Sequence, residues 1–140
     1  PRKWHIDLNG SFSWTPSINC GEPYSPADRS VGRQLPYVPE FSSNITGRLS
    51  WRRWAFLYKW CSYSTRYTMS SNDLSLSGTL PPYFMSNISL ERTISLRWAE
   101  LSIKGAINNL FNEEYLSVLS RPMPGINFEI FISITHNLRR

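Results

Sequence analysis

Regular alternation of apolar and polar side chains is the feature that most limits what this chain can fold into. In the run HIDLNGSFSWT, apolar residues recur at nearly every second position and polar residues stand between them. This period of two is typical of β-strands with two unlike faces, and helical periodicity hardly occurs in the chain. Five later runs repeat the pattern. The predicted strands cover residues 4–15, 41–51, 54–67, 83–93, 98–107 and 127–138.

The connections between these runs alternate between long and short. Polar, proline-bearing loops span about residues 16–39, 69–82 and 111–124, whereas the turns at Arg52-Arg53 and Leu96-Arg97 are very short. Up-and-down outer-membrane barrels join strands of about ten residues in this way, with short periplasmic turns and long extracellular loops. The sequence therefore predicts an all-β fold of about six antiparallel transmembrane strands.

Four tryptophans lie on the side of the predicted short turns. Trp51 and Trp54 flank one turn, Trp98 follows the other, and Trp4 begins the first strand. Tryptophan is enriched where a membrane meets water. We therefore expect these four residues to lie at one level and to form an aromatic girdle, the alternative being that they fill a protein core.

The basic charge of the chain does not favour a nucleic-acid partner. The sequence has 15 Lys and Arg against 10 Asp and Glu, a formal net charge of +5, but the basic residues are scattered in ones and twos. A nucleic-acid interface needs them clustered on one face. No apolar run approaches the roughly 18 residues that a membrane-spanning helix requires.

No pattern in the chain predicts catalysis, a cofactor or a metal site. His5 and His136 lie at opposite ends of the chain, away from any nucleophile motif. Glu113 and Glu114 could form an acid–base pair or a calcium site. The start of a solvated loop is the favoured interpretation of this pair.

Two other architectures stay open at this point. Glycosylation triplets begin at Asn9, Asn44 and Asn87, and a Cys20–Cys61 disulfide would suit a secreted β-sandwich. A small autonomous barrel of eight strands with a structural or adhesion role would show the same loop alternation.

An incomplete barrel explains the number of strands. Single-chain bacterial barrels begin at about eight strands. An open sheet edge in lipid leaves backbone N–H and C=O groups without partners, at a cost of several kcal/mol each. We therefore expect the first and last strands to pair with strands outside residues 1–140, and the chain to be the final portion of a larger barrel.

Two motifs near the end of the chain carry a family resemblance. Residues 108–115 read NNLFNEEY and residues 122–128 read PMPGINF. Both are similar to the closing strands of TonB-dependent outer-membrane receptors, which typically carry NNLFN-x-x-Y and P-M-P-G-R-N-F. Upstream, LPYVPEFSSNITGRLSW and TRYT with LPPYFMSNISL resemble earlier strands of these barrels. The motif residues are Asn108, Asn109, Leu110, Phe111, Asn112, Tyr115, Pro122, Met123, Pro124 and Gly125.

The resemblance implies a fold, a function and a set of partners. The chain would be the C-terminal segment, residues 1–140, of a barrel of about 22 strands whose plug domain lies elsewhere. The function would be uptake of an iron–siderophore, haem or cobalamin across the bacterial outer membrane, without enzyme activity. The implied partners are the rest of the barrel, the plug, outer-membrane lipid, a TonB-type energy-transducing complex, the barrel-assembly machinery and a surface lipoprotein.

The last strand resembles the signal that the barrel-assembly machinery reads. Its residues are Phe128, Ile130, Ile132, Ile134 and Leu138. Two positions depart from the family pattern, because Ile126 stands where Arg is usual and Leu138 where an aromatic residue is usual.

The orientation that the resemblance implies puts the C-terminus in the periplasm and the three long loops outside. Tyr24, Arg29 and Arg33 of the first loop are then the predicted ligand contacts. Cys20 would lie outside and Cys61 near mid-barrel, so we expect no disulfide between them. The residues expected to face the lumen and the plug are Asn44, Arg48, Ser50, Lys59, Ser102 and Lys104.

Overall fold

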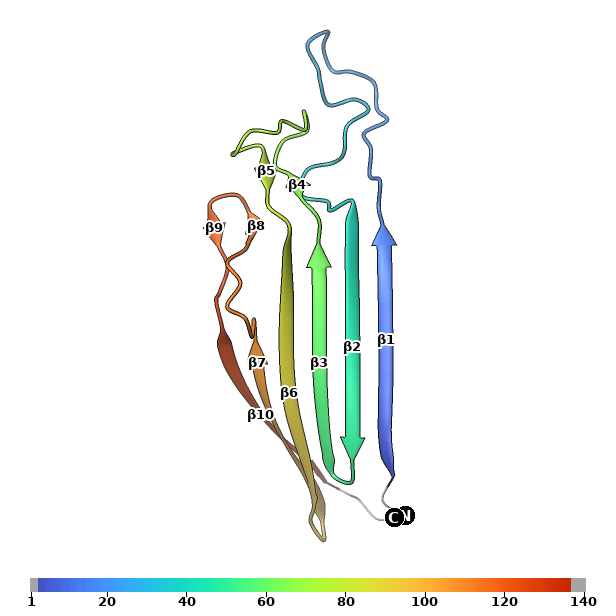
Figure 1. Ribbon diagram of the computed structural model, residues 1–140, viewed down its shortest axis with the longest axis vertical. Coiled ribbons are helices and arrows are strands. Elements are labelled where there is room, and N and C mark those ends of the chain that lie inside the picture. The colour runs from blue at the N-terminus through green and yellow to red at the C-terminus, as the bar shows by residue number, and fades with distance from the viewer. Residues whose placement is uncertain (1–2, 137–140) are drawn as a thin grey trace.

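Six long antiparallel strands form one twisted sheet in the computed structural model, which describes residues 3–136 (Figure 1). The strands are β1 (Trp4–Trp14), β2 (Phe41–Trp51), β3 (Trp54–Tyr63), β6 (Tyr83–Ser95), β7 (Ala99–Asn108) and β10 (Asn127–His136). They lie in the order β1-β2-β3-β6-β7-β10, so each long strand pairs with the next one along the chain. The predicted all-β, antiparallel, up-and-down arrangement is confirmed, and the sheet does not close within the described residues.

Long and short connections fall at opposite ends of the sheet. In Figure 1 the three long loops lie together at the top, and the β2–β3 and β6–β7 turns lie at the bottom. Two loops contain small hairpins: β4 (Arg66–Tyr67) pairs with β5 (Thr79–Leu80), and β8 (Leu116–Val118) pairs with β9 (Arg121–Pro122). The described residues contain no helix long and apolar enough to cross a membrane.

Several strand boundaries differ from the prediction. The third strand was expected to reach residue 67, but β3 ends at Tyr63, because its partner β2 begins at Phe41 and offers nothing further to pair with. The fourth extends to Ser95 instead of ending at residue 93, since pairing with β7 continues to Glu100. The last strand is described to His136, and Leu138 of the predicted assembly signal lies outside the described residues.

The pairing register sorts the alternating side chains onto two faces. Residues directly opposite each other in an antiparallel pair point to the same side of the sheet. Thr46, Lys59 and Asn87 are aligned across β2, β3 and β6, and they belong to the polar face. All six residues expected to face the lumen share this polar face, namely Asn44, Arg48, Ser50, Lys59, Ser102 and Lys104.

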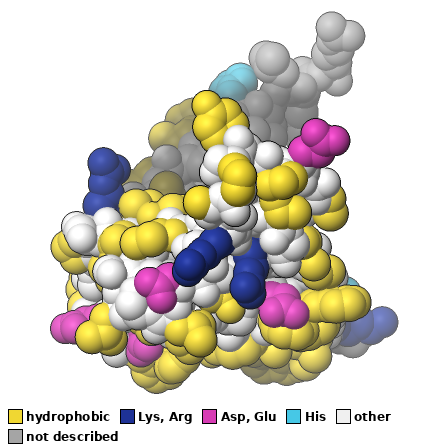
Figure 2. Space-filling view, turned by 90° about the horizontal axis from the view of Figure 1, so that it is seen from above, with side chains coloured by type: hydrophobic (Ala, Val, Ile, Leu, Met, Phe, Trp, Pro, Cys, Tyr) yellow, Lys and Arg dark blue, Asp and Glu magenta, His cyan; other side chains and the backbone are white. Residues whose placement is uncertain are grey.

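The sheet is a single layer whose apolar face has no protein covering among the described residues. Leu80 and Ala99 are the buried hydrophobic residues, whereas Leu8 is 78% and Ile130 is 77% exposed. Figure 2, viewed from the loop end, shows hydrophobic side chains over much of the visible surface, with charged ones among them. Exposing so many aliphatic and aromatic side chains to water is unfavourable by about 25 cal/mol per Å². This face therefore requires an apolar environment.

Candidate functional site: a two-faced wall and its loop clamp

Aromatic residues lie in two rows at the two ends of the apolar face. At the short-turn end Trp4 stacks on Trp51, with ring centroids 5.2 Å apart, and Trp54 is paired with Trp51 across the turn. At the loop end Trp14 lies opposite Phe41, and Phe41 stacks on Phe12 with centroids 6.0 Å apart. Side chains between the rows on this face are mainly aliphatic or aromatic, with glycine and serine.

The separation of the two rows matches the thickness of an outer-membrane apolar band. Trp4 and Trp14 are the first and last residues of β1. The ten steps between them span about 33 Å along a strand, which a tilt of about 40° reduces to about 25 Å. Transmembrane barrels carry an apolar band of about 25 Å between two aromatic girdles. The spacing is therefore that of a membrane-spanning wall.

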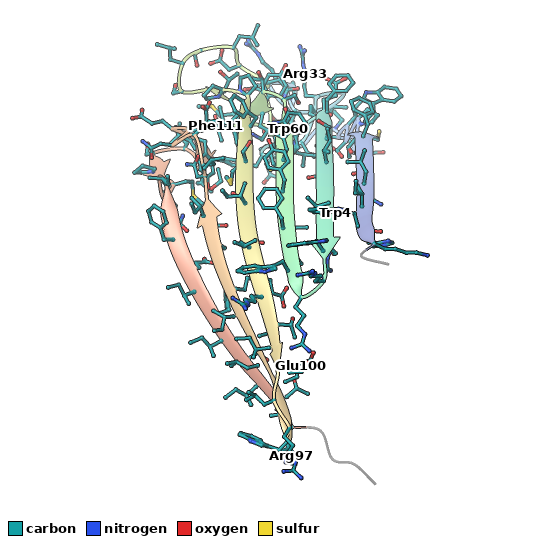
Figure 3. The ribbon with its side chains drawn as sticks, turned by 60° about the horizontal axis from the view of Figure 1, so that its bottom comes forward. Trp4, Arg33, Trp60, Arg97, Glu100 and Phe111 are labelled. Atoms are coloured by element: carbon teal, nitrogen blue, oxygen red, sulfur yellow. The ribbon has the colours of Figure 1, made fainter. Side chains whose placement is uncertain are left out.

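The four tryptophans predicted as a girdle do not share one register row. Trp4, Trp51 and Trp54 do, but this row continues through Arg92 to Ile103 on β7. Trp98 lies beyond Ile103, because β6 and β7 continue pairing past the level of the β2–β3 turn, and its ring lies 6.2 Å from that of His136. Figure 3 shows the neighbouring Arg97 at the tip of this hairpin, well beyond Trp4.

Sequence reasoning did not identify Trp14, Phe41 or Phe84 as members of the row at the loop end. Trp14, Phe41 and Phe84 were assigned to strands, but their places beside long loops were not recognised as a second girdle. Phe111 extends this row, since its ring meets that of Phe84 edge-on at 6.4 Å. Aromatic residues at the loop-side ends of strands were the signal that could have revealed it.

The NNLFN motif forms a tight exit from β7. Asn109 and Asn112 both have a positive φ of 52°, a backbone conformation that asparagine tolerates better than most residues. The Asn109 backbone N–H donates to Asn87 Oδ1 at 2.9 Å, and the Leu110 N–H donates to the Ser86 carbonyl oxygen at 2.8 Å. The chain therefore leaves the sheet while still bonded to β6.

The Asn109 side chain fastens the loop beyond this exit. It is 2% exposed, and its Oδ1 accepts a hydrogen bond from the Glu113 N–H at 2.8 Å. Its Nδ2 donates to the carbonyl oxygens of Glu113 at 2.9 Å and Pro124 at 3.4 Å. One amide thus joins the NNLFN motif to the PMPG motif.

Asn112 makes the second link between the two motifs. Its Oδ1 accepts a hydrogen bond from the Ile126 N–H at 2.9 Å. A Cβ added at Gly125 would lie 2.5 Å from that same oxygen. We call the contacts of Asn109 and Asn112 with residues 124–126 the loop clamp. It explains physically why asparagine and glycine occur at these positions.

Replacing Gly125 with alanine is expected to break the hydrogen bond between Asn112 and Ile126 in the loop clamp. The added methyl group would displace Asn112 Oδ1 and remove the bond to Ile126, at a cost of about 1–2 kcal/mol. Hydrogen exchange at the Ile126 amide in the full-length protein should accelerate several-fold. Gly105→Ala is the matched control, because its Cβ would meet no atom within 4 Å. Unchanged protection at Ile126 in the Gly125 variant would contradict the clamp.

Arg66 joins the second and third long loops. It is 5% exposed, and its Nη2 donates to the carbonyl oxygens of Leu116 at 2.9 Å and Pro81 at 3.4 Å. Its guanidinium lies 4.9 Å above the ring of Tyr83, which stacks on Tyr115 with centroids 4.7 Å apart. Burial lowers the pKa of Arg66 from its ordinary value, yet arginine remains charged in proteins.

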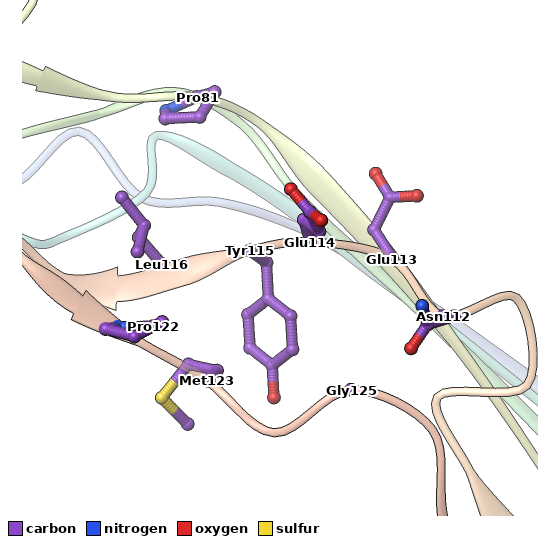
Figure 4. Close-up of a pocket in the computed structure, with 9 residues that line it drawn as sticks. All are labelled: Pro81, Asn112, Glu113, Glu114, Tyr115, Leu116, Pro122, Met123 and Gly125. Carbon is purple, nitrogen blue, oxygen red and sulfur yellow. The ribbon is translucent and has the colours of Figure 1, made fainter.

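A cavity of about 580 Å³ lies beside the clamp (Figure 4). Residues from both motifs line it, including Asn112, Tyr115, Met123 and Gly125. Burial raises the pKa of the Tyr115 phenol. Glu113 and Glu114 also line the cavity, and no group of acids, histidines and cysteines among the described residues could hold a metal ion.

The predicted ligand contacts lie in one loop, and none of them lines the cavity beside the clamp. Tyr24 is 98% exposed, and its backbone N–H donates to Asp28 Oδ2 at 3.0 Å. Hydrogen bonds from the backbone N–H groups of Ser30 and Tyr24 lower the pKa of Asp28. Arg29 and Arg33 are exposed, and Figure 3 shows Arg33 at the loop end.

The remaining predicted residues fall on identifiable faces. Phe128, Ile130, Ile132 and Ile134 of β10 all point to the apolar face of the sheet. Cys20 is exposed in the first loop and Cys61 lies on β3, and both are free.

Comparison with known proteins identifies the fold. Residues 2–110 match the family described as TonB dependent receptor-like, beta-barrel. BauA, the ferric preacinetobactin receptor of Acinetobacter baumannii, is similar in structure with a TM-score of 0.69 and 13% sequence identity. The superposition covers 94% of this chain and 20% of that receptor, so the chain spans about a fifth of its length.

The comparison with curated proteins found no match. The family match ends at residue 110, so it includes Asn108 and Asn109 but not the PMPG half of the clamp. It covers most of the two-faced sheet described above, including its two aromatic rows on β1, β2 and β3. The chain belongs to the β-barrel family of TonB-dependent receptors.

Proposed function

We propose that residues 1–140 form the C-terminal wall segment of a bacterial outer-membrane receptor that imports a scarce nutrient. The observation that carries this proposal is the apolar face, bounded by aromatic rows about 25 Å apart in projection. Lipid against that face removes the exposed aliphatic side chains from water. The polar face then lines the barrel lumen.

The two edges of the sheet support a larger barrel. Within the described residues, β1 and β10 each pair on one side alone. In lipid their free backbone groups would cost several kcal/mol each. Strands from elsewhere in the full-length protein would satisfy them, and barrels of about 22 strands have a plugged lumen. The final position of this segment rests on the resemblance of its two motifs to closing strands.

The mechanism follows from this architecture. The wall is held by lipid on one side, while Arg48, Lys59 and Lys104 present charge to the plug on the other. Ligand would bind above the plug, and a TonB-type complex would supply energy by pulling on the plug. The barrel-assembly machinery would read β10, and a surface lipoprotein would meet the loops. In this mechanism the chain forms part of the barrel wall and of the extracellular loops, and it carries out no chemical step.

The substrate class that we propose is an iron–siderophore, haem or cobalamin. BauA is named as a receptor for ferric preacinetobactin. That similarity favours the siderophore class within the proposal. Expression of the full-length protein in a strain lacking its own receptors would test this directly. Outer-membrane recovery and energy-dependent uptake of one of these ligands would support the proposal, and a protein found in the soluble fraction would overturn it.

Shortening the first long loop is expected to weaken ligand capture. Removing residues 21–30 deletes Tyr24 and Arg29, whose exposed side chains are suited to anionic or aromatic ligand groups. Loss of one or two charge-assisted contacts should raise the apparent Kd about ten-fold or more. Binding of the imported ligand to whole cells measures this change. Removing residues 74–76 from the second loop is the control, and equal affinity of the wild type and the first variant would exclude these contacts.

A further inference from the structure

Three arginines and two tryptophans surround a cavity at the short-turn end of the sheet. The cavity has a volume of about 570 Å³ and is lined by Trp51, Arg52, Arg53, Trp54, Arg92, Thr93 and Ile94. These residues come from the β2–β3 turn and from the neighbouring end of β6. The cavity is far from the loop clamp, which lies at the other end of the strands (Figure 1).

Arg92 is the most informative member of this cluster. It lies directly opposite Trp54, and it is the one Lys, Arg, Asp or Glu among the described strand positions of the apolar face. A charge on a lipid-facing surface is tolerated near the membrane interface but not at its centre. Its guanidinium lies 4.9 Å above the Trp54 ring, so it is held at the level of the aromatic row.

The β2–β3 turn holds the other two arginines beside Arg92. The Thr93 N–H donates to the Arg53 carbonyl oxygen at 2.9 Å, which fastens the turn to β6. The Arg52 guanidinium lies 4.7 Å above the Trp51 ring. The guanidinium groups of Arg52 and Arg92 are thus stacked on neighbouring tryptophans. The third arginine, Arg53, directly follows Arg52 in the same turn.

This cationic cluster has no acidic partner in the part of the chain that the structure describes. The one ion pair found between residues 3 and 136 joins His5 to Asp7. Guanidinium groups bind phosphate oxygens with two parallel hydrogen bonds, and arginine is the preferred residue for this recognition. An unpaired group of three at a membrane interface is therefore suited to a phosphate that the membrane itself carries.

We propose that this cavity binds the phosphate headgroup of an anionic phospholipid in the leaflet at the short-turn end. The inference rests on the proposed membrane-wall function. Trp51, Trp54 and Ile94 offer apolar surface that continues into the lipid-facing sheet, where the acyl chains would lie. A zwitterionic headgroup that carries an ammonium would be repelled by three guanidinium groups, so phosphatidylglycerol should be preferred to phosphatidylethanolamine.

Native mass spectrometry of the full-length protein can measure this preference. The wild type, released from detergent with equal phosphatidylglycerol and phosphatidylethanolamine, should retain the anionic lipid about ten-fold more. The variant R52Q/R53Q/R92Q should lose that preference, and R52K/R53K/R92K should keep most of it because the charge remains. R121Q changes an exposed arginine of β9 at the opposite end of the sheet and should keep the wild-type lipid preference.

Lipid binding at this cavity and insertion of the protein into the outer membrane can fail independently, and the measurements distinguish the two failures. Equal lipid retention by the wild type and the glutamine variant would overturn the lipid site, even if the protein is recovered in the outer membrane. Competition by millimolar inorganic phosphate as effective as competition by lipid would assign the site to free phosphate and overturn the lipid proposal. Failure to recover the wild type in the outer membrane would instead contradict the proposed function. Heat-modifiable migration on gels verifies that each variant has folded.

Discussion

Replacing Ile45 with arginine is expected to destabilise the full-length barrel in lipid by about 2–4 kcal/mol. Ile45 lies on the apolar face, opposite Gly10 and Trp60, and about midway between the aromatic rows at Phe41 and Trp51. A charge at that depth would have to leave water entirely or deform the bilayer. Equilibrium unfolding by urea in lipid vesicles measures the change in the free energy of unfolding.

The neighbouring residue provides the matched control. Asn44 precedes Ile45 and belongs to the polar face, opposite Ser11 and Cys61. Asn44→Arg adds the same side chain at nearly the same depth, but on the lumen side, where water and polar groups can solvate it. We expect a change below about 1 kcal/mol. Equal destabilisation by the two substitutions would show that the faces are not differently solvated.

Replacing Asn109 with alanine is expected to cost about 3 kcal/mol in local stability of the third loop. The substitution leaves the half-buried Glu113 N–H without its acceptor and removes the donor to the Glu113 and Pro124 carbonyl oxygens. Each such unpaired group costs about 1–3 kcal/mol. Alanine also tolerates the positive φ of 52° less well than asparagine does. Hydrogen exchange across residues 110–126 should accelerate by about a hundred-fold.

Asn108 is the control for this substitution. It is the last residue of β7 and half-buried, and its side chain makes one hydrogen bond, donating to Asn127 Oδ1 at 3.0 Å. Asn108→Ala should change the hydrogen-exchange rates of residues 110–126 by less than ten-fold, because the Asn108 side chain is not the hydrogen-bond partner of any backbone group in the loop. Similar acceleration in both variants would mean that the loop is held by strand pairing and not by the Asn109 side chain.

The sheet was predictable because its signal is local and repeated. Alternation in β1 and β2 fixes which side chains share a face, and the register that pairs Asp7 with Arg48 and Asn9 with Thr46 keeps that alternation intact across the strands. The short turn at Arg52 and Arg53 likewise fixes its own register. These features need no knowledge of distant parts of the chain.

Features that depend on contacts between distant segments could not be predicted. Residues 66–67 continue the alternation of β3 in sequence, yet they leave the sheet to pair with residues 79–80. Arg66 becomes buried through Leu116, fifty residues away, and no local pattern marks that contact. The motif at Asn109 was recognised by resemblance, but its physical reason, an amide bonded to two segments, required the fold.

Trp98 lies off the register row of Trp4, Trp51 and Trp54 for a related reason. Sequence position beside a short turn indicates the side of the membrane, but it does not indicate how far each hairpin extends. Pairing of Ser95 with Glu100 carries the β6–β7 hairpin beyond the β2–β3 turn. Register between neighbouring hairpins, which the sequence does not reveal, decides which register row each aromatic residue occupies.

We propose that the apolar face of this sheet contacts lipid while the polar face lines a lumen. Nitroxide labels placed one at a time at residues 43–49 of the full-length protein in lipid vesicles would report on which face each side chain lies. Relaxation by oxygen, which concentrates in the bilayer, should peak at Ser43, Ile45, Gly47 and Leu49 and fall at the three residues between them. Oxygen accessibility without this period of two, or with its maxima on Asn44, Thr46 and Arg48, would show that the apolar face does not contact lipid.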